Sequence, residues 1–266
     1  MELNGIVKKY GAVSAVAGID LRIEPGEIVG YLGPNGAGKS TTIKMLAGLI
    51  EPSAGEILFR GEPIRRDIFS FRKILGYVPE QSEIYPHLTG SEYLLMVGRL
   101  RHIPEKRLKR QIVELMELFS LSLEMDLSIS SYSKGMVQKV LIASALLHDP
   151  EVILLDEPLT GLDVTTSMII KDLLGMLAEE GRIIMYSSHI LEVVEKVCSR
   201  VVILHEGRIV ADDSVDNLRN LMALPSLDDI FSQLVKQEDT ESAARGILDV
   251  IKLGNRGMRG RPGGKA

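Results

Sequence analysis

One stretch of this sequence has the residues needed to hold phosphate groups. The pattern G-x-x-x-x-G-K followed by Ser or Thr is matched in full from Gly33 to Ser40. Glycines let backbone N–H groups turn inward around phosphate oxygens, and a helix that follows points its positive end at them. Lys39 supplies a mobile cation for the outer phosphates, and the Ser40 hydroxyl can bind magnesium. The predicted phosphate site consists of Gly33, Pro34, Asn35, Gly36, Ala37, Gly38, Lys39, Ser40 and Thr41.

Two carboxylates follow a short apolar run much further along the chain. Residues 152–155 are Val-Ile-Leu-Leu, and Asp156 and Glu157 come directly after them. A buried strand that ends in carboxylates presents them where α/β folds bind ligands. Asp156 could hold magnesium through water, and Glu157 could orient and deprotonate an attacking water. Strands often end in acidic turns, so the acid pair alone is a weak indication of a catalytic site. The full phosphate loop in the same chain makes that indication strong.

These residues need a scaffold, and the sequence indicates an α/β core. Apolar runs bounded by turn residues predict strands, and we expect them at residues 21–23, 28–32, 55–60, 74–78, 152–155, 183–186, 201–204 and 208–211. Helical patterns separate most of the later strands. Short apolar strands that alternate with helices are typical of a parallel sheet buried on both faces.

A helical insert is expected to interrupt this core at about residues 84–148. Thr89 and Glu92 have the spacing of a capping box that opens a helix. Apolar residues at helical spacing follow in three stretches within the insert. We therefore divide the chain into a nucleotide-binding domain (1–222, with the insert), a helical appendage (223–253) and a flexible basic tail (254–266).

Composition narrows the possible partners. The chain has 266 residues, of which 31 are basic and 36 acidic, and its net charge is -5. Duplex binding usually brings a basic face, so no nucleic-acid partner is expected. The longest apolar runs are much shorter than the roughly 20 residues of a bilayer span, so we do not expect the chain to cross a membrane by itself. Its single cysteine, Cys198, favours a reducing compartment.

The order of the motifs resembles that of a nucleotide-binding domain of the ATP-binding-cassette (ABC) superfamily, over about residues 1–222. Tyr10 stands where that family stacks an aromatic residue on adenine. Tyr132-Ser133-Lys134-Gly135-Met136 stands where the family has its signature, usually Leu-Ser-Gly-Gly-Gln. Asp163, in Gly-Leu-Asp, resembles the loop that crosses between two copies, and His189, in Ser-Ser-His, resembles the switch histidine. The implied fold is a P-loop NTPase core with a mainly parallel sheet, an antiparallel N-terminal β subdomain and the helical insert.

The chain departs from the family pattern at two places. The signature keeps Ser133 and Gly135, the positions that contact phosphate in the family, but carries Lys134 between them. The family's glutamine loop falls on Val-Pro-Glu-Gln, where the usual glutamine position is Glu80 and Gln81 is next to it. Gln81 is taken as a magnesium-site residue together with Ser40 and Asp156, and the choice between Glu80 and Gln81 stays open.

The resemblance implies an ATPase that drives a transporter, with ATP and Mg²⁺ as its cofactors. Two copies, or a pseudo-dimer, would close on two ATP molecules, with Glu157, His189 and Lys39 as the catalytic residues. Transmembrane permease subunits would be the partners, export is favoured by the form of the signature, and the chain would sit at the inner face of the cell membrane. The alternative is a soluble ATPase of the same superfamily that acts on ribosomes or DNA. A GTPase is set aside, because no Asn-Lys-x-Asp sequence occurs.

Overall fold

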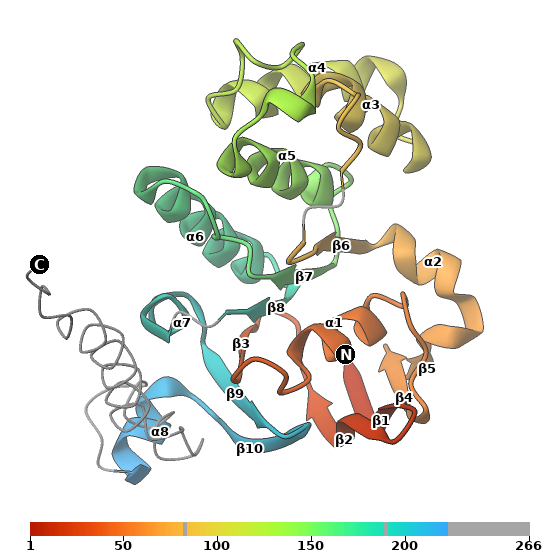
Figure 1. Cartoon of the computed structure of the whole chain (residues 1–266), viewed down its shortest axis with the longest axis vertical. Coiled ribbons are helices and arrows are strands. Elements are labelled where there is room, and N and C mark those ends of the chain that lie inside the picture. Colours follow the sequence, from red (N-terminus) through yellow and green to blue (C-terminus); the bar gives the residue numbers. More distant parts are fainter. Residues whose placement is uncertain (82–83, 189–190, 223–266) are drawn as a thin grey trace, which may run out of the picture.

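The computed structural model describes residues 1–81, 84–188 and 191–222, and two sheets organise this part of the chain. The larger sheet has six strands in the order β10-β9-β3-β8-β7-β6 (Figure 1). All its neighbouring pairs run parallel except β9 and β10. This confirms the expected mainly parallel sheet. Its strands are β3 (Ile28–Leu32), β6 (Leu75–Val78), β7 (Val152–Asp156), β8 (Ile183–Ser187), β9 (Arg200–His205) and β10 (Arg208–Asp213).

The second sheet is antiparallel and is built mostly from the N-terminal residues. Its order is β2-β1-β4-β5, formed by β1 (Glu2–Tyr10), β2 (Val13–Arg22), β4 (Ala54–Phe59) and β5 (Glu62–Pro63). Residues 21–23 and 28–32 were both expected as strands. The structure places residues 21–22 at the end of β2 and residues 28–32 in β3, which belong to different sheets. The turn between them therefore carries the chain from one sheet to the other.

Helices cover the main sheet and form a separate layer at one end of the molecule. Figure 1 shows α3, α4 and α5 gathered at the top, away from the antiparallel sheet. Thr89 caps α3 with the expected capping box. The helices are α1 (Lys39–Leu46), α2 (Ile68–Lys73), α3 (Gly90–Leu100), α4 (Glu105–Leu118), α5 (Lys134–Leu146), α6 (Val164–Glu179), α7 (Leu191–Val197) and α8 (Val215–Met222), with short 3-10 helices at Ile64–Asp67 and Ile129–Ser131.

Alternate residues of the central strands face two separate hydrophobic cores. In β8, Ile184 and Tyr186 join the core that includes the helical layer, whereas Ile183 and Met185 join the core shared with α1 and the antiparallel sheet. Every residue of β3, β7 and β8 is buried. Side chains alternate across a strand, so a sheet covered on both faces requires an unbroken apolar run. That requirement explains why these strands could be identified from sequence.

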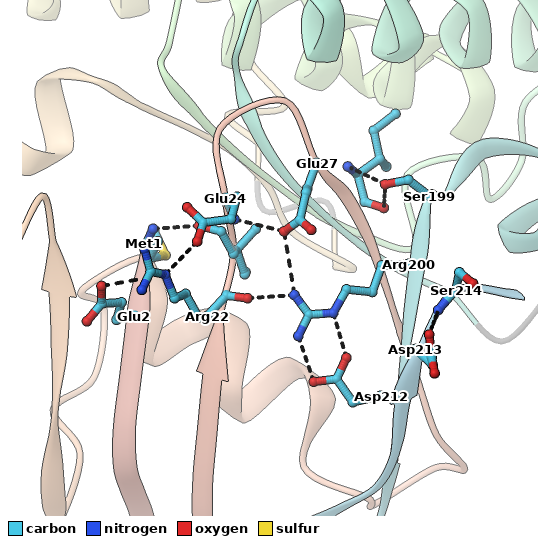
Figure 2. Close-up of polar contacts among 12 residues, drawn as sticks. Met1, Glu2, Arg22, Glu24, Glu27, Ser199, Arg200, Asp212, Asp213 and Ser214 are labelled. Atoms are coloured by element: carbon cyan, nitrogen blue, oxygen red, sulfur yellow. Dashed lines mark hydrogen bonds and ion pairs between the residues drawn. The ribbon is translucent and has the colours of Figure 1, made fainter. Parts of the chain in front are cut away.

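A polar network joins the edge of the main sheet to the antiparallel sheet. Figure 2 shows the Arg200 guanidinium at its centre. Arg200 donates to both carboxylate oxygens of Asp212, at 2.6 and 2.7 Å, and to the carbonyl oxygen of Arg22 at 2.8 Å. Its Nη1 also lies 3.5 Å from Glu27 Oε2. A paired, bidentate guanidinium of this kind fixes orientation as well as adding energy. Arg200 therefore fixes the end of β2, in the antiparallel sheet, against β9 and β10 of the main sheet.

None of the helices in the described part of the chain has both the length and the apolar composition that crossing a bilayer requires.

Candidate functional site

The phosphate loop joins the C-terminal end of β3 to the first residue of α1. Gly36 and Gly38 have φ angles of 80° and 105°, which favour glycine. A side-chain carbon on Gly38 would lie 2.4 Å from the carbonyl oxygen of Ala15, and one on Gly33 would lie 2.6 Å from that of Leu204. The glycines are thus required both by backbone conformation and by close packing. Together they leave the N–H groups at the start of α1 directed toward one hollow.

Lys39 lies folded against this loop. Its Nζ donates to the carbonyl oxygens of Gly33 and Pro34 at 2.6 and 3.1 Å. Burial lowers the pKa of Lys39, and the nearby carboxylates of Glu157, Asp156 and Glu80 act in the opposite direction. A partly buried cation is most stable beside a counter-charge. An anionic group entering the hollow would supply one.

Asp156 and Glu157 lie at the end of β7, beside the loop. Asp156 is 1% exposed, and its Oδ2 has no hydrogen-bond partner among the described residues. Burial raises the pKa of Asp156, and the hydroxyls of Ser40 and Ser187 partly offset that effect. A buried carboxylate oxygen that lacks a donor is a hard ligand ready for a cation or for water bound to one.

Glu157 is held where the strand turns into the following loop. It has a φ of 52°, and its N–H donates to the carbonyl oxygen of Ser187 at 3.0 Å. The Ser188 hydroxyl donates to Glu157 Oε2 at 3.4 Å. A left-handed conformation in a residue other than glycine carries strain of about 1–3 kcal/mol, which must be stabilised by the surrounding structure. The two contacts with the end of β8 fix the carboxylate at the mouth of the hollow.

The loop after β6 brings a third carboxylate to the same place. The Ser40 hydroxyl donates to Glu80 Oε2 at 3.3 Å. Gln81 also lines the hollow, but no hydrogen bond of its side chain to Ser40 is observed. Of the two residues between which the sequence left the choice open, Glu80 is therefore the one that contacts the Ser40 hydroxyl. The role of Gln81 at a magnesium site stays a prediction.

One pocket of about 1010 Å³ collects most of the predicted residues. Tyr10 stands at its rim with 51% of its surface exposed, and Lys8 Nζ lies 5.4 Å from the centre of its ring. Ala37 is buried in the core instead of lining the pocket. The predicted residues that do line it are Tyr10, Gly33, Pro34, Asn35, Gly36, Gly38, Lys39, Ser40, Thr41, Gln81, Asp156 and Glu157.

Three predicted residues lie outside this pocket, at the starts of two helices. Ser133 caps α5 by accepting from the N–H of Met136 at 3.2 Å, and Gly135 follows it in the first turn. Asp163 caps α6 by accepting from Thr166, which lowers its pKa to about 2. None of these three residues lines the pocket formed by their own chain. His189 lies outside the described residues, as do the predicted appendage (223–253) and tail (254–266).

Several residues in the pocket were not predicted from the sequence. Ser188 stands in the Ser-Ser-His motif, in which the sequence assigns a role only to its neighbour His189. Ala15 comes from β2, in the other sheet, and only the folded chain brings it to the loop. The unpredicted residues are Ala15, Lys134, Thr160, Ser188 and Leu191, whereas Glu80 was one of the two alternatives for the glutamine-loop position.

The donor set suits a small divalent cation held together with phosphates. Mg²⁺ prefers oxygen ligands, and in phosphate sites it is usually bound through one or two side chains together with the substrate. Ser40 and Asp156 offer a hydroxyl and an orphaned carboxylate oxygen at the edge of the phosphate loop. The pocket therefore combines a cradle for phosphates, a cation, a candidate metal position and a carboxylate suited to activating water.

Comparison with known sequences leads to a family with this arrangement. The family model described as ABC transporter matches residues 16–160. The chain is 38% identical over 230 residues to the ABC transporter ATP-binding protein NatA of Bacillus subtilis, covering 86% of this chain and 94% of NatA. It is 37% identical over 212 residues to the Nod factor export ATP-binding protein I of Paraburkholderia xenovorans, covering 80% of this chain and 70% of that protein.

Solved structures of ATP-binding cassettes have the same fold as this chain. An ATP-binding subunit of an ABC transporter superposes with a TM-score of 0.82 at 33% identity, covering 88% of this chain and 98% of that one. A dimeric ATP-binding cassette in a post-hydrolysis state, bound to ADP and phosphate, superposes with a TM-score of 0.74 at 25% identity, covering 80% of this chain and 97% of that one.

Proposed function

Since this chain belongs to the ABC transporter family, we propose that it is the ATP-hydrolysing subunit of an exporter and acts through separate membrane subunits. The observation that carries the proposal is the single pocket that brings together the whole phosphate loop, Lys39, Asp156 and Glu157. Residues 33–41 and 156–157 are far apart in sequence, and only the pairing of β3, β8 and β7 in one sheet places them side by side. ATP is the substrate, and hydrolysis of its outer phosphate is the reaction.

In this proposal the chain positions the reacting groups and stabilises their charge, as other phosphoryl-transfer sites do. Backbone N–H groups of the loop cradle the phosphates. Lys39 leaves its contacts with Gly33 and Pro34 to reach the outer phosphate oxygens, and its lowered pKa returns toward the ordinary value when that negative charge arrives. Glu157, fixed by the end of β8, orients the attacking water and accepts its proton.

Magnesium belongs to the same proposal. Ser40 and Asp156 are the residues that would hold it, and the Oδ2 atom of Asp156 that lacks a partner is the observation that supports this assignment. When bound, the cation neutralises charge on the phosphate oxygens. The contact between Ser40 and Glu80 can remain when the cation is bound, because a hydroxyl that donates its proton to a carboxylate keeps oxygen lone pairs for a metal ion.

The likeness to transport proteins supports transport over the alternative of a soluble ATPase acting on ribosomes or DNA. A relative matched over 80% of this chain is named for Nod factor export. The variant signature, with Lys134 inside it, resembles that of exporter-type subunits. On this reading, the membrane subunits choose the exported compound, and this chain lies against them at the inner face of the cell membrane.

A second copy would complete the site. Ser133, Gly135 and Asp163 lie outside the pocket of their own chain, at helix starts that could face a partner. The dimeric cassette that superposes on this chain supports such an arrangement. Each of the two sites would combine the Lys39 loop of one copy with the Ser133 helix start of the other.

The substitution Glu157→Gln tests the proposed chemistry. The amide keeps the size of the side chain but cannot take a proton, so hydrolysis should slow by about 10²–10⁴-fold. ATP affinity should stay near that of the unmodified chain, because the phosphates are held by the loop and Lys39. Nucleotide titration and steady-state phosphate release measure the two effects.

Lys39→Ala is the matched control, because it should lose binding as well as turnover. Near-normal turnover of the Glu157→Gln protein would remove Glu157 from its proposed role. If the unmodified chain binds no ATP at all, the proposed function itself fails.

A further inference from the structure

Another cavity, of about 520 Å³, lies between the end of α1, the strands β4 and β5, and α2. Figure 1 shows these elements on the same side of the molecule. The cavity shares no lining residue with the nucleotide pocket. Sites that bind small molecules usually have volumes of about 300–1,000 Å³, so this cavity is large enough for a ligand of its own.

The wall of this cavity is largely apolar. Met45, Ile57 and Ile64 line it, and each is at most 8% exposed and belongs to the core shared with the antiparallel sheet. Leu49 also lines it and is 53% exposed. The apolar lining therefore extends from the core to the surface, where it can remove the apolar part of a ligand from water.

Gly48 shapes the cavity where α1 ends. Its φ is 64°, and its N–H donates to the carbonyl oxygen of Met45 at 3.0 Å. A side-chain carbon on Gly48 would lie 2.3 Å from Cδ1 of Ile68, which also lines the cavity. A larger residue would have to displace Ile68, so the glycine allows α2 to pack directly on the end of α1.

Arg72 brings a positive charge to the same place. Its Nη2 donates to the carbonyl oxygen of Gly48 at 2.5 Å. Its Nε is buried without a hydrogen-bond partner, and the half-buried guanidinium forms no ion pair with any residue that the structure describes. Burying a charge costs free energy unless the charge is paired. The guanidinium therefore lacks the counter-charge that its partly buried position favours.

The other charged groups of the lining do not neutralise Arg72. Arg65 forms an ion pair with Glu56, so these two charges balance each other. Glu51 is exposed, and its backbone carbonyl accepts from Lys8 Nζ at 2.7 Å. Among the described residues of this cavity, Arg72 thus carries the half-buried charge that no carboxylate neutralises.

We propose that this cavity binds a small amphipathic carboxylate, with its apolar chain against Met45, Ile57 and Ile64 and its head on the Arg72 guanidinium. The forked N–H donors of a guanidinium match a carboxylate, and such charged hydrogen bonds are stronger than neutral ones. A phosphate monoester would bring a charge of about -1.5 to -2 at pH 7 and leave part of it unpaired. The inference goes beyond the proposed function and does not depend on it.

Titration calorimetry of the full chain with octanoate, in the absence of nucleotide, tests this site. Octanoate should bind at about one molecule per chain, and octanol, which has the same chain without the charge, should bind about tenfold more weakly. Arg72→Met removes the guanidinium and should weaken octanoate binding by about tenfold. The same substitution should change octanol binding by less than about twofold, because the apolar wall is kept.

A pair of substitutions at the exposed Leu49 tests the charge without touching the hydrogen bond between Arg72 and Gly48. Leu49→Glu should weaken octanoate binding by about threefold, which is the size of an exposed charge interaction. Leu49→Lys removes the same apolar side chain but should bind octanoate more tightly than Leu49→Glu. Leu118→Glu, at the exposed last residue of α4, is the control and should leave octanoate binding unchanged.

Three results overturn the inference: no octanoate binding, octanol binding as tight as octanoate binding, or equal octanoate affinities for Leu49→Glu and Leu49→Lys. If thermal unfolding shows that Arg72→Met is unstable, the Leu49 pair decides. Equal octanoate affinities for a folded Arg72→Met protein and the unmodified chain also overturn it. Failure of the proposed function is measured separately, by titration of ATP into the unmodified chain and into Lys39→Ala.

Discussion

At the scale of single residues, the ionised carboxylate of Asp156 destabilises the folded chain, because it is buried. Its carboxylate is almost fully buried and one of its oxygens lacks a partner among the described residues. Burial raises the pKa of Asp156, so the folded chain binds a proton there more readily than the unfolded chain. By linkage, the free energy of unfolding falls as pH rises from near the ordinary value of 3.8 through the raised value, and the loss persists at neutral pH.

Asp156→Asn should therefore make the nucleotide-free protein more stable and less active. Removing the charge relieves the burial cost, and a gain of about 1 kcal/mol raises Tm by roughly 2–4 °C in a domain of this size. Loss of a group that orients the metal's ligands should lower ATP turnover by about 10–100-fold. Thermal unfolding without nucleotide and phosphate release with Mg²⁺ measure the two effects.

Asp172→Asn on the exposed side of α6 is the control and should change neither quantity. The stability gain should also vanish at a pH below 3.8, where the carboxyl is neutral in both states. A lower Tm for Asp156→Asn at neutral pH would mean that contacts in the folded chain stabilise the charged carboxylate.

The residues of the site differ in how far the sequence could predict them. The phosphate loop and the acid pair are contiguous motifs, so their chemistry can be identified before the fold is known. Glu80 and Gln81 are neighbours in a loop without periodicity, and only the folded chain shows which one reaches Ser40. Lys134 lines the pocket and packs against Gly161, which lies 27 residues later in the chain. No local sequence pattern predicts a contact between residues so far apart.

At the scale of elements, the irregular pairing of β1 explains why no sequence pattern predicted this strand. Its pairing with β2 shifts register at three places, so its buried residues do not alternate regularly. A period of two is the signal by which a half-buried strand is identified. The unbroken apolar runs of β3, β7 and β8 gave a clear signal because both of their faces are covered.

The segment between β6 and α3 is the element we expect to meet the membrane subunit. Tyr85 is 62% exposed, whereas Ile84 packs partly buried against the core. The backbone after it is held in place, because the N–H groups of Ile129 and Ser130 donate to the carbonyl oxygens of Leu88 and Pro86. An exposed aromatic on a fixed backbone, five residues after Glu80 in the sequence, is suited to passing a change at the nucleotide to a docked partner.

Tyr85→Asp tests this docking surface. The exposed position predicts a change of less than about 0.5 kcal/mol in the free energy of unfolding, and ATP turnover of the isolated protein should be unchanged. Co-purification with the membrane subunit and transport should be lost, because a charge would be buried without a partner in the interface. Thermal unfolding, phosphate release and a pull-down measure the three effects.

Phe69→Asp provides the control, since Phe69 is an exposed aromatic on α2, which is not part of this segment. It should keep both the partner and the transport activity. A Tyr85→Asp protein that still pulls down its membrane subunit would place the coupling surface elsewhere.

At the scale of the whole molecule, three of the predicted site residues, Ser133, Gly135 and Asp163, lie outside the pocket of their own chain. The Glu157→Gln protein should form a dimer when ATP and Mg²⁺ are present, because slow hydrolysis leaves the closed state populated. Adding Ser133→Arg should abolish that dimer, since a bulky cation at the start of α5 would block the facing pocket. Sedimentation with and without nucleotide measures whether each protein is a monomer or a dimer.

The Arg substitution also removes the α5 cap, in which Ser133 accepts from Met136. That loss costs about 0.5–2 kcal/mol of stability. Ser133→Ala removes the same hydrogen bond without adding bulk or charge, so it should dimerise more readily than the Arg variant. A Glu157→Gln protein that stays monomeric with ATP and Mg²⁺ contradicts the shared site.

The strand order of the main sheet also decides when the pocket can form during synthesis. β3, which leads into the phosphate loop, lies between β8 and β9, and both of these come from the last third of the described chain. A nascent chain that ends at residue 160 already contains the loop and both acids, yet both edges of β3 still lack their neighbours. The antiparallel pairs β1–β2 and β1–β4 need only the first 59 residues. The N-terminal sheet can therefore assemble early, whereas the nucleotide pocket must wait for contacts of high sequence separation, which are slow to close.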